Sequence, residues 1–128
     1  MKYYLDSSAI LKFILDESES RSLRKLHIDD AYSSDITRLE VRRTLDRLDS
    51  PDGTPAKEAL EMIHSVELSE TVLSIAESFR GLPMLRSLDA IHLASATIVK
   101  SKIKAIITYD HDMATAAELL GFEVLAPK

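Results

Sequence analysis

The sequence of 128 residues contains no cysteine, so it has no disulfide framework, no thiolate metal site and no cysteine nucleophile. Any metal ion must therefore bind through carboxylates and histidine. Glycine and proline are also scarce, at three and four residues, which favours long helices and argues against low complexity or disorder. At about 100–200 residues per domain, the length predicts a single domain over residues 1–128.

Long apolar runs and excess positive charge are lacking as well. The apolar stretches fall far short of the roughly 18–20 residues that span a bilayer, and the acid at Asp6 comes too early for a signal peptide. We therefore expect a cytoplasmic protein without membrane contact. Sixteen Lys and Arg against 21 Asp and Glu leave a net charge of −5, which excludes a protein that coats nucleic acid by bulk charge. Any contact with a polyanion must be local or assisted by a metal ion.

Strand patterns alternate with helix patterns along the chain. Short apolar strands are predicted at 3–5, 31–33, 65–68, 104–108 and 122–125. Helices are predicted between them, including those at 35–48, 55–64, 85–98 and 112–120, and a turn is predicted at 50–53. This alternation predicts right-handed crossovers, a parallel sheet of roughly five strands and helices on both faces, which is a three-layer α/β/α domain.

Aspartates follow the strands of this predicted sheet. Asp6 comes directly after the first strand, Asp110 follows the fourth, and Asp89 lies near the start of the helix at 85–98. Ligand sites in open parallel sheets lie beyond the carboxyl ends of the strands, so we expect these side chains to converge. No Lys or Arg adjoins any of them in the sequence. Crowded carboxylates repel one another and take up protons unless a cation binds, and oxygen ligands alone select Mg²⁺ or Mn²⁺.

Each acid also has a purely structural interpretation. A helix N-cap needs one acid and no convergence, and this role is open to three residues: Asp6, Asp110 and Asp112. Asp89 fits a first-turn acid that the helix dipole favours. Glu40 lies among apolar residues of the helix at 35–48, where a carboxylate needs a partner, and with Thr37 it fits a capping box. Ser34 and Asp35 are candidate N-caps of the same helix.

Other polar residues near the acids have weaker claims to chemistry. His92 lies one helical turn after Asp89, and on an apolar helix we expect it to be a hydrogen-bonded core histidine rather than a metal ligand. Ser7 and Ser8 have no His with an acid partner to activate them, so capping or support of the acids is favoured over nucleophilic catalysis.

Four segments in a fixed order span almost the whole chain. They read Tyr-Leu-Asp-Ser-Ser-Ala at 4–9, Thr-Arg-Leu-Glu-Val at 37–41, Leu-Arg-Ser-Leu-Asp-Ala-Ile-His-Leu-Ala at 85–94, and Thr-Tyr-Asp at 108–110 running on to Gly-Phe-Glu-Val-Leu at 121–125. In these segments the chain resembles the PIN-domain ribonucleases, and more narrowly the VapC-type toxins of prokaryotic toxin–antitoxin modules. The third segment followed by Thr-x-Asp is the specific part of the resemblance.

The resemblance implies a catalytic acidic quartet that holds Mg²⁺ or Mn²⁺, formed by Asp6, Glu40, Asp89 and Asp110. Asp112 matches an additional acid that some members lack, and Ser8 matches a small hydroxyl residue near the metal. The implied activity is an endoribonuclease in which a metal-activated water attacks the RNA phosphodiester, with either Asp110 or Glu40 orienting that water. Two basic residues beside the site, Arg80 and Arg86, are candidate contacts to RNA, and solvated loop charges are the alternative.

The helices at 35–48 and 55–64 have more apolar residues than one sheet face absorbs. The first also carries a group of arginines: Arg38, Arg42, Arg43 and Arg47. An apolar surface with a basic rim indicates an interaction site, and a solvated basic helix face is the alternative. The resemblance implies a cognate antitoxin whose C-terminal segment occupies this groove, and a toxin that forms a homodimer.

Other function classes fit less well. A catalytically inactive binding module of the same fold keeps the helix caps but does not need five acids at one edge. A phospho-acceptor receiver domain needs an aspartate at the end of the third strand, where this chain has Leu-Ser-Glu at 68–70, and a lysine after a late strand, where it has Thr-Tyr-Asp. An aspartyl-phosphate phosphatase needs a second aspartate two positions after Asp6, where this chain has Ser8.

Overall fold

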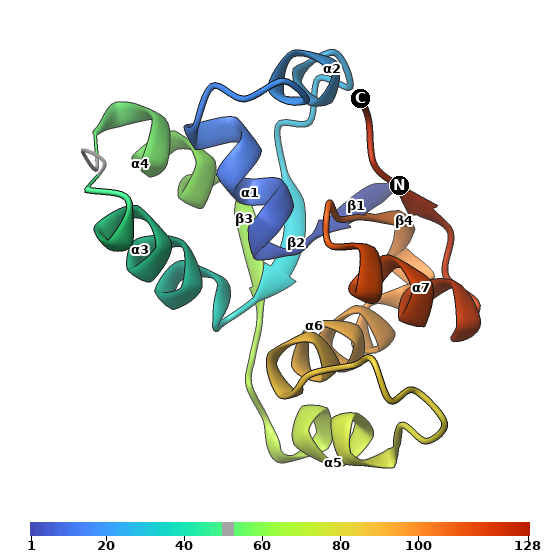
Figure 1. The fold of residues 1–128 in the computed structure, drawn as a ribbon. Helices are drawn as coiled ribbons and strands as arrows, with labels where there is room; N and C mark the ends of the chain where they lie inside the picture. The colour runs from blue at the N-terminus through green and yellow to red at the C-terminus, as the bar shows by residue number, and fades with distance from the viewer. Residues whose placement is uncertain (50–52) are drawn as a thin grey trace.

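The computed structural model describes residues 1–49 and 53–128 (Figure 1). The described residues form one parallel sheet with the strand order β3-β2-β1-β4-β5. The strands are β1 (Lys2–Leu5), β2 (Ala31–Ser34), β3 (Ile63–Val66), β4 (Ile103–Ile107) and β5 (Val124–Leu125). The helices are α1 (Ser7–Ile14), α2 (Ser20–Arg24), α3 (Thr37–Arg47), α4 (Thr54–Glu61), α5 (Glu70–Ser78), α6 (Ser87–Ile98) and α7 (His111–Leu119), and a 3-10 turn spans Lys100–Lys102. The predicted α/β class and the five-stranded parallel sheet are confirmed.

The sheet separates two apolar cores. Successive side chains of the central strands point to opposite faces, so Tyr4 and Ile106 enter one core while Leu5 and Ile107 enter the other. Helices α5, α6 and α7 cover the first face, and α1, α2, α3 and α4 cover the second (Figure 1). All four of these strand residues are fully buried. Burial on both faces explains why the central strands read as continuous apolar runs.

The connections from β1 and β4 create a switch point in the middle of the sheet. From β1 the chain proceeds to β2 and β3 at one edge, then returns through α5 and α6 to β4 on the other side of β1. Leu5 pairs with Ile107, so the next residues of the two strands, Asp6 and Thr108, lie side by side at the carboxyl edge. Open parallel sheets form their ligand sites at this kind of position.

The third strand begins earlier than predicted. Its observed span is Ile63–Val66 rather than 65–68, and the preceding helix ends at Glu61 rather than at residue 64. The backbone N–H of Ala31 donates to the carbonyl of Met62, so pairing with β2 has already started there. The apolar residue at 63 continues the helical spacing of α4, but tertiary pairing overrides that local pattern.

The predicted N-caps of α3 have other partners. The Ser34 hydroxyl accepts a hydrogen bond from the N–H of Ile36, and the Asp35 carboxylate accepts one from the distant N–H of Leu68. The helix starts at Thr37 without a side-chain cap. The N-cap prediction is therefore wrong, because Asp35 ties the start of α3 to the end of β3 instead.

The C-terminal half has the predicted order of elements with different bounds: β4 spans Ile103–Ile107 rather than 104–108, and β5 spans Val124–Leu125 rather than 122–125. Gly121 adopts a φ of +91° just past α7, as expected of a residue that ends a helix. Helix α6 is buried only in its middle, over 92–96, while Leu88 and Ile98 near its ends are exposed. Most of the turn predicted at 50–53 lies outside the described residues. Within the described chain, no helix has the length and apolar character needed to cross a membrane.

Candidate active site

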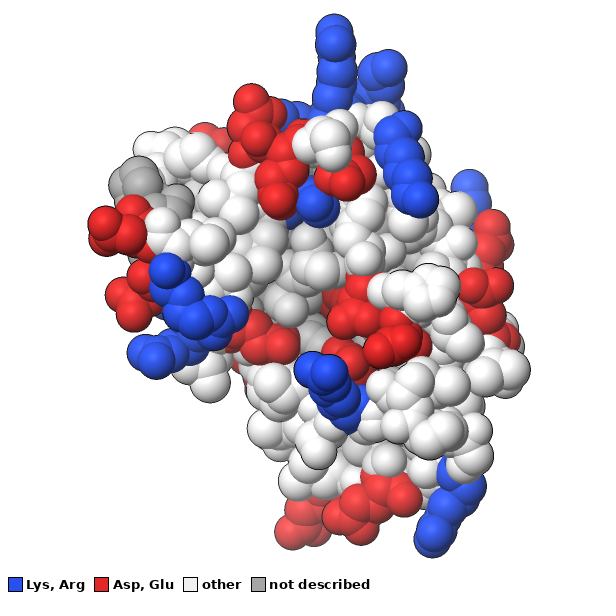
Figure 2. All heavy atoms as spheres, in the orientation of Figure 1, with Lys and Arg blue, Asp and Glu red and all other residues white. Residues whose placement is uncertain are grey.

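Acidic side chains from three helices line one pocket at the carboxyl edge of the sheet. The pocket has a volume of about 470 Å³ and is lined by Glu40, Arg86, Ser87, Leu88, Asp89, Asp110 and Asp112. Figure 2 shows the acidic side chains gathered in the central hollow of this face, with basic side chains around it. The structure thus gathers four of the five predicted acids on its wall, and the fifth, Asp6, is buried beside them. A hollow of similar volume between α1, α2 and α4 has no comparable cluster of acidic side chains.

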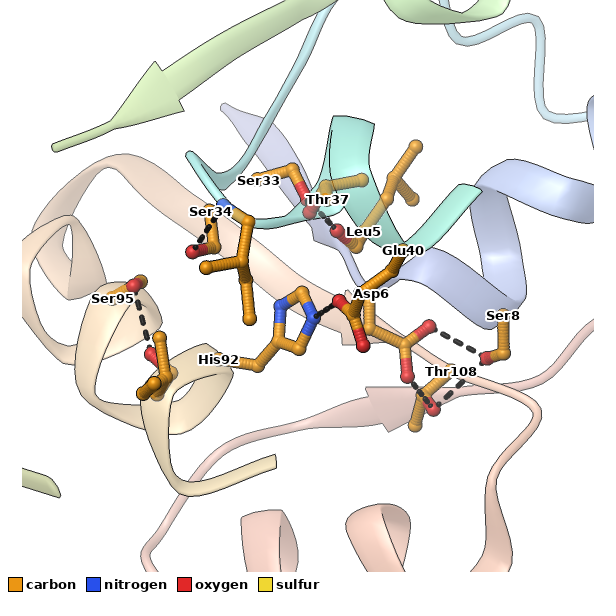
Figure 3. Close-up of polar contacts among 12 residues, drawn as sticks. Leu5, Asp6, Ser8, Ser33, Ser34, Thr37, Glu40, His92, Ser95 and Thr108 are labelled. Atoms are coloured by element: carbon orange, nitrogen blue, oxygen red, sulfur yellow. Dashed lines mark hydrogen bonds and ion pairs between the residues drawn. The ribbon is translucent and has the colours of Figure 1, made fainter. Parts of the chain in front are cut away.

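Asp6 is held at the end of β1 by several donors. Its Oδ1 accepts hydrogen bonds from the Ser8 hydroxyl at 2.6 Å and from the N–H of Ala9 at 3.0 Å, and its Oδ2 accepts from the Thr108 hydroxyl (Figure 3). The bond to Ala9 makes Asp6 the N-cap of α1. Asp6 is 4% exposed, and this burial raises the pKa of its carboxyl group despite the donors around it. Asp6 is therefore both a helix cap and part of the acidic site.

The hydroxyls of Ser8 and Thr108 join the ends of β1 and β4. The Ser8 hydroxyl accepts from the N–H of Tyr109 at 2.9 Å, and the Thr108 hydroxyl accepts from the N–H of Asp110 at 3.1 Å. Asp110 in turn caps α7, because its Oδ1 accepts from the N–H of Met113 at 3.0 Å. The supporting role predicted for Ser8 is confirmed. Thr108 was not predicted, although its position in the Thr-x-Asp segment was a usable signal.

Asp89 lies in the first turn of α6, and its surroundings in the pocket shift its pKa. Partial burial raises the pKa of Asp89 from 3.8 to about 6, and the charges of three neighbouring acids act in the same direction: Asp110, Asp6 and Glu40. In the described part of the chain, no Lys or Arg forms an ion pair with Asp6, Asp89 or Asp110. The four carboxylates therefore lie close together with no Lys or Arg paired to three of them, and such perturbed acids are typical of functional sites.

Glu40 is held by His92 and not by a capping box. The hydroxyl of Thr37, its proposed partner, pairs with the hydroxyl of Ser33. Glu40 Oε1 instead lies 2.7 Å from His92 Nε2, and His92 Nδ1 lies 2.8 Å from the hydroxyl of Tyr4. The contact between His92 and Glu40 is drawn in Figure 3. The capping-box interpretation is wrong, and His92 is the buried, hydrogen-bonded histidine that the sequence predicted. The sequence did not predict that the partner of His92 is one of the acids of the site.

The acids share a pocket without pointing at one common centre. Over residues 1–49 and 53–128, no three His, Asp or Glu side chains come close enough together to hold a metal ion as they lie. Hydrogen bonds engage both oxygens of Asp6, one of Glu40 and one of Asp110. The donor set nevertheless consists of carboxylate oxygens, and this chemistry suits Mg²⁺ or Mn²⁺.

The two arginines predicted beside the site occupy different places. Arg86 directly precedes α6 and lines the acidic pocket. Arg80 is exposed in the loop between α5 and α6, and it is not among the residues that line the pocket. Arg86 is therefore the residue of this pair that is positioned to meet an anionic ligand at the acids.

Helix α3 presents an exposed surface that combines apolar and basic side chains, which we call the α3 surface. Its members are Arg38, Leu39, Arg42, Arg43, Arg47 and Leu48, all exposed, with 63% exposure for Leu39 and 57% for Leu48. Two helices were predicted to carry more apolar residues than one sheet face can bury. The apolar residues of α4 are buried, so of these two helices only α3 exposes apolar side chains. A hollow of about 350 Å³ runs beside α3. It meets the acidic pocket because Glu40 and Leu88 line both.

Comparison with known proteins agrees with this geometry. The PIN domain family model matches residues 3–119. Among curated proteins, Ribonuclease VapC47 of Mycobacterium tuberculosis (strain CDC 1551 / Oshkosh) is 35% identical over 131 residues, which cover 97% of this chain and 96% of the relative. Ribonuclease VapC46 of Mycobacterium tuberculosis (strain ATCC 25618 / H37Rv) is 39% identical over 129 residues with the same coverage.

Solved structures share the fold at lower sequence identity. A toxin–antitoxin complex from Klebsiella pneumoniae superimposes with a TM-score of 0.74 at 17% identity and covers 99% of this chain and 98% of its own. The Sarcin-Ricin loop cleaving toxin VapC20 of Mycobacterium tuberculosis gives a TM-score of 0.72 at 15% identity and covers 98% of this chain and 100% of its own. The family-model match and the 35–39% identical relatives show that the chain belongs to the PIN domain family and is similar to VapC ribonucleases within it.

Proposed function

We propose that this protein is an endoribonuclease that depends on Mg²⁺ or Mn²⁺ and acts as the toxin of a prokaryotic toxin–antitoxin module. The observation that carries the proposal is that four acids line one pocket beside the buried Asp6, where burial and the charges of the neighbouring acids raise the pKa of Asp89 to about 6. Such a field favours a bound cation over four separate carboxylates. The ribonuclease names of the 35–39% identical relatives support RNA as the substrate.

The acidic residues would hold the ion through their carboxylates: Asp6, Glu40, Asp89 and Asp110, with Asp112 as an additional acid on the pocket wall. A bound Mg²⁺ or Mn²⁺ supplies Lewis-acid chemistry, lowering the pKa of a water toward neutrality and offsetting negative charge on the leaving oxygen. Ser8 and Thr108 orient Asp6 through their hydroxyls. Either Asp110 or Glu40 orients the attacking water by accepting a hydrogen bond from it.

The charge distribution limits how RNA binds. The net charge of −5 and the acidic pocket repel a phosphate backbone, so few direct contacts hold the substrate. Arg86 lines the same pocket and is the side chain proposed to contact a phosphate beside the acids. Because the site lies at an open edge of the sheet, the substrate is a single-stranded or loop RNA rather than a strand within a duplex.

The proposal also includes a cognate antitoxin that binds the α3 surface. The exposed Leu39 and Leu88 line the hollow beside α3 together with the basic Arg43 and Arg47, and an apolar surface with a basic rim is typical of a protein interface. The hollow beside α3 opens into the acidic pocket, so a segment bound along α3 reaches the acids with a basic side chain that takes the place of the metal. In the absence of antitoxin we expect a homodimer, and light scattering of the purified protein measures its mass.

Cleavage of a labelled single-stranded RNA by the purified protein tests the proposal. We expect cleavage with Mn²⁺ or Mg²⁺, none in EDTA, and recovery when excess Mn²⁺ is added back. Asp110→Asn is expected to abolish cleavage, whereas the control Asp46→Asn, an exposed acid on α3 outside the pocket, retains it. Cleavage that persists in EDTA contradicts the metal mechanism. Absence of cleavage with every metal on a panel of RNAs favours the catalytically inactive binding module.

A further inference from the structure

A chain of two hydrogen bonds runs from the buried face of the sheet to the acidic pocket. The Tyr4 hydroxyl lies 2.8 Å from His92 Nδ1, and His92 Nε2 lies 2.7 Å from Glu40 Oε1. Tyr4 is fully buried, and the side chains of His92 and Glu40 are 2% and 20% exposed. Glu40 is therefore the end of the chain that reaches solvent, and Tyr4 is the end enclosed in the core.

The chemistry of the three groups gives the direction of both bonds. An ionised carboxylate only accepts hydrogen bonds, so Nε2 must carry the hydrogen in its contact with Glu40. In the neutral ring that carries this hydrogen, Nδ1 has the lone pair, and the Tyr4 hydroxyl donates to it. The two rings also meet edge to face, with an interplanar angle of 81° and centroids 5.9 Å apart. This packing opposes rotation of the imidazole, which would turn a C–H group toward Glu40.

We infer that His92 is a positioning residue for Glu40, and that the Tyr4 hydroxyl holds the His92 ring in place through Nδ1. The inference rests on the proposed function, because it concerns one of the acids proposed to hold the metal. If the Tyr4 hydroxyl is removed, Nδ1 loses its partner, and the imidazole is then held only by its bond to Glu40 and by packing. Removing the His92 donor itself takes the supporting partner from Glu40, and loss of such a partner typically lowers metal affinity about 10–100-fold.

A purely structural role for the same groups predicts a different result. In the described chain every buried polar side-chain atom has a hydrogen-bond partner, so removing one partner destabilises the fold in either case. If Tyr4 and His92 served the fold alone, their variants would melt earlier while the folded protein kept its affinity for Mn²⁺. The affinity for Mn²⁺ therefore separates the two roles.

The variant Tyr4→Phe removes only the hydroxyl, and Tyr3→Phe is its matched control. Tyr3 lies on the opposite face of β1, and its hydroxyl forms no hydrogen bond within the described chain. Imidazole ¹⁵N spectra of the metal-free protein are expected to show His92 as the Nε2–H tautomer in the wild type and in Tyr3→Phe. Calorimetry at a temperature where every variant is folded should show Mn²⁺ binding weakened in Tyr4→Phe and unchanged in Tyr3→Phe.

Two amide substitutions of His92 provide a second, independent comparison. The amide nitrogen of Gln reaches about as far as Nε2, whereas that of Asn reaches only as far as Nδ1. His92→Gln is therefore expected to keep a donor to Glu40 and to retain Mn²⁺ affinity within a few-fold of the wild type. His92→Asn introduces the same chemical group without the reach and is expected to bind Mn²⁺ about tenfold or more weakly.

The outcomes that overturn the inference differ from those that overturn the proposed function. A wild-type spectrum with the Nδ1–H tautomer or a doubly protonated ring refutes the assigned bonds. Equal Mn²⁺ affinity in the wild type, Tyr4→Phe and His92→Asn refutes the positioning role and leaves metal-dependent cleavage intact. Failure of the wild-type protein to bind Mn²⁺ or Mg²⁺ at all refutes the proposed function, and the inference with it.

Discussion

Replacing Asp89 with Asn is expected to stabilise the metal-free protein at neutral pH. The substitution keeps the shape of the side chain and removes a negative charge that burial and the neighbouring acids disfavour. The pKa of Asp89 is raised from 3.8 to about 6, and each pKa unit is worth 1.36 kcal/mol, which sets an upper limit of about 3 kcal/mol. The side chain is only half-buried, so solvent screening reduces the expected gain to about 1 kcal/mol. In a domain of this size, that gain raises Tm by roughly 3–6 °C.

The sign of the pH dependence follows from the direction of the shift. The folded protein binds the Asp89 proton more tightly than the unfolded chain does, because the folded pKa of about 6 exceeds the ordinary value of 3.8. The contribution of Asp89 to stability is therefore fully present below about pH 4 and is lost as the pH rises through 6. Asp6 acts in the same direction, since burial raises its pKa. The difference between Asp89→Asn and the wild type should thus be small near pH 4.5 and largest above pH 7.

Urea denaturation in EDTA at several pH values between 4.5 and 8 measures this difference. Asp46→Asn, which removes an exposed acid on α3, is the matched control and is expected to change the free energy of unfolding by no more than about 0.5 kcal/mol. The reasoning is refuted if Asp89→Asn is no more stable than the wild type at pH 7.5. It is equally refuted if the difference between them does not change with pH.

Three further predictions concern the metal, the partner and the fold. Mn²⁺ at a free concentration of 100 Kd is expected to raise the free energy of unfolding of the wild type by about 2.7 kcal/mol and so to raise its Tm, and Asp6→Asn should reduce this rise. A wild-type melting curve unaffected by millimolar Mn²⁺ contradicts the site. Charge reversal at Arg42 and Arg43 is expected to weaken binding of the cognate antitoxin, measured by calorimetry, more than RNA cleavage, and unchanged antitoxin affinity contradicts the role of the α3 surface. Ser69→Ala removes the N-cap that accepts from the N–H of Val72 and should cost about 1 kcal/mol in urea denaturation, so an unchanged midpoint contradicts that assignment.

Local sequence pattern determined the class of the fold and the identity of the acids. The branched apolar run at 103–107 reads as a buried parallel strand because both of its faces are covered. Asp6 and Asp110 follow β1 and β4, and parallel strands end at the same edge, so their proximity follows from order along the chain and strand direction. Their capping of α1 and α7 is equally local, since each accepts from an N–H three residues ahead.

Only the tertiary structure decided the contacts between distant segments. The local sequence predicts Asp35 as the cap of its own helix. In the structure its carboxylate instead accepts a hydrogen bond from the N–H of Leu68, 33 residues away. Glu40 and His92 are 52 residues apart, and each by itself fits a purely structural role in its own helix, Glu40 in a capping box and His92 in the core. Their bond exists because β2 and β4 flank β1, so that α3 and α6, which cover opposite faces of the sheet, meet at its carboxyl edge. A hydrogen-bond partner supplied by another element leaves no periodic trace in the sequence, which is why the local support of Asp6 by Ser8 was predicted and the distant pairing of Glu40 with His92 was not.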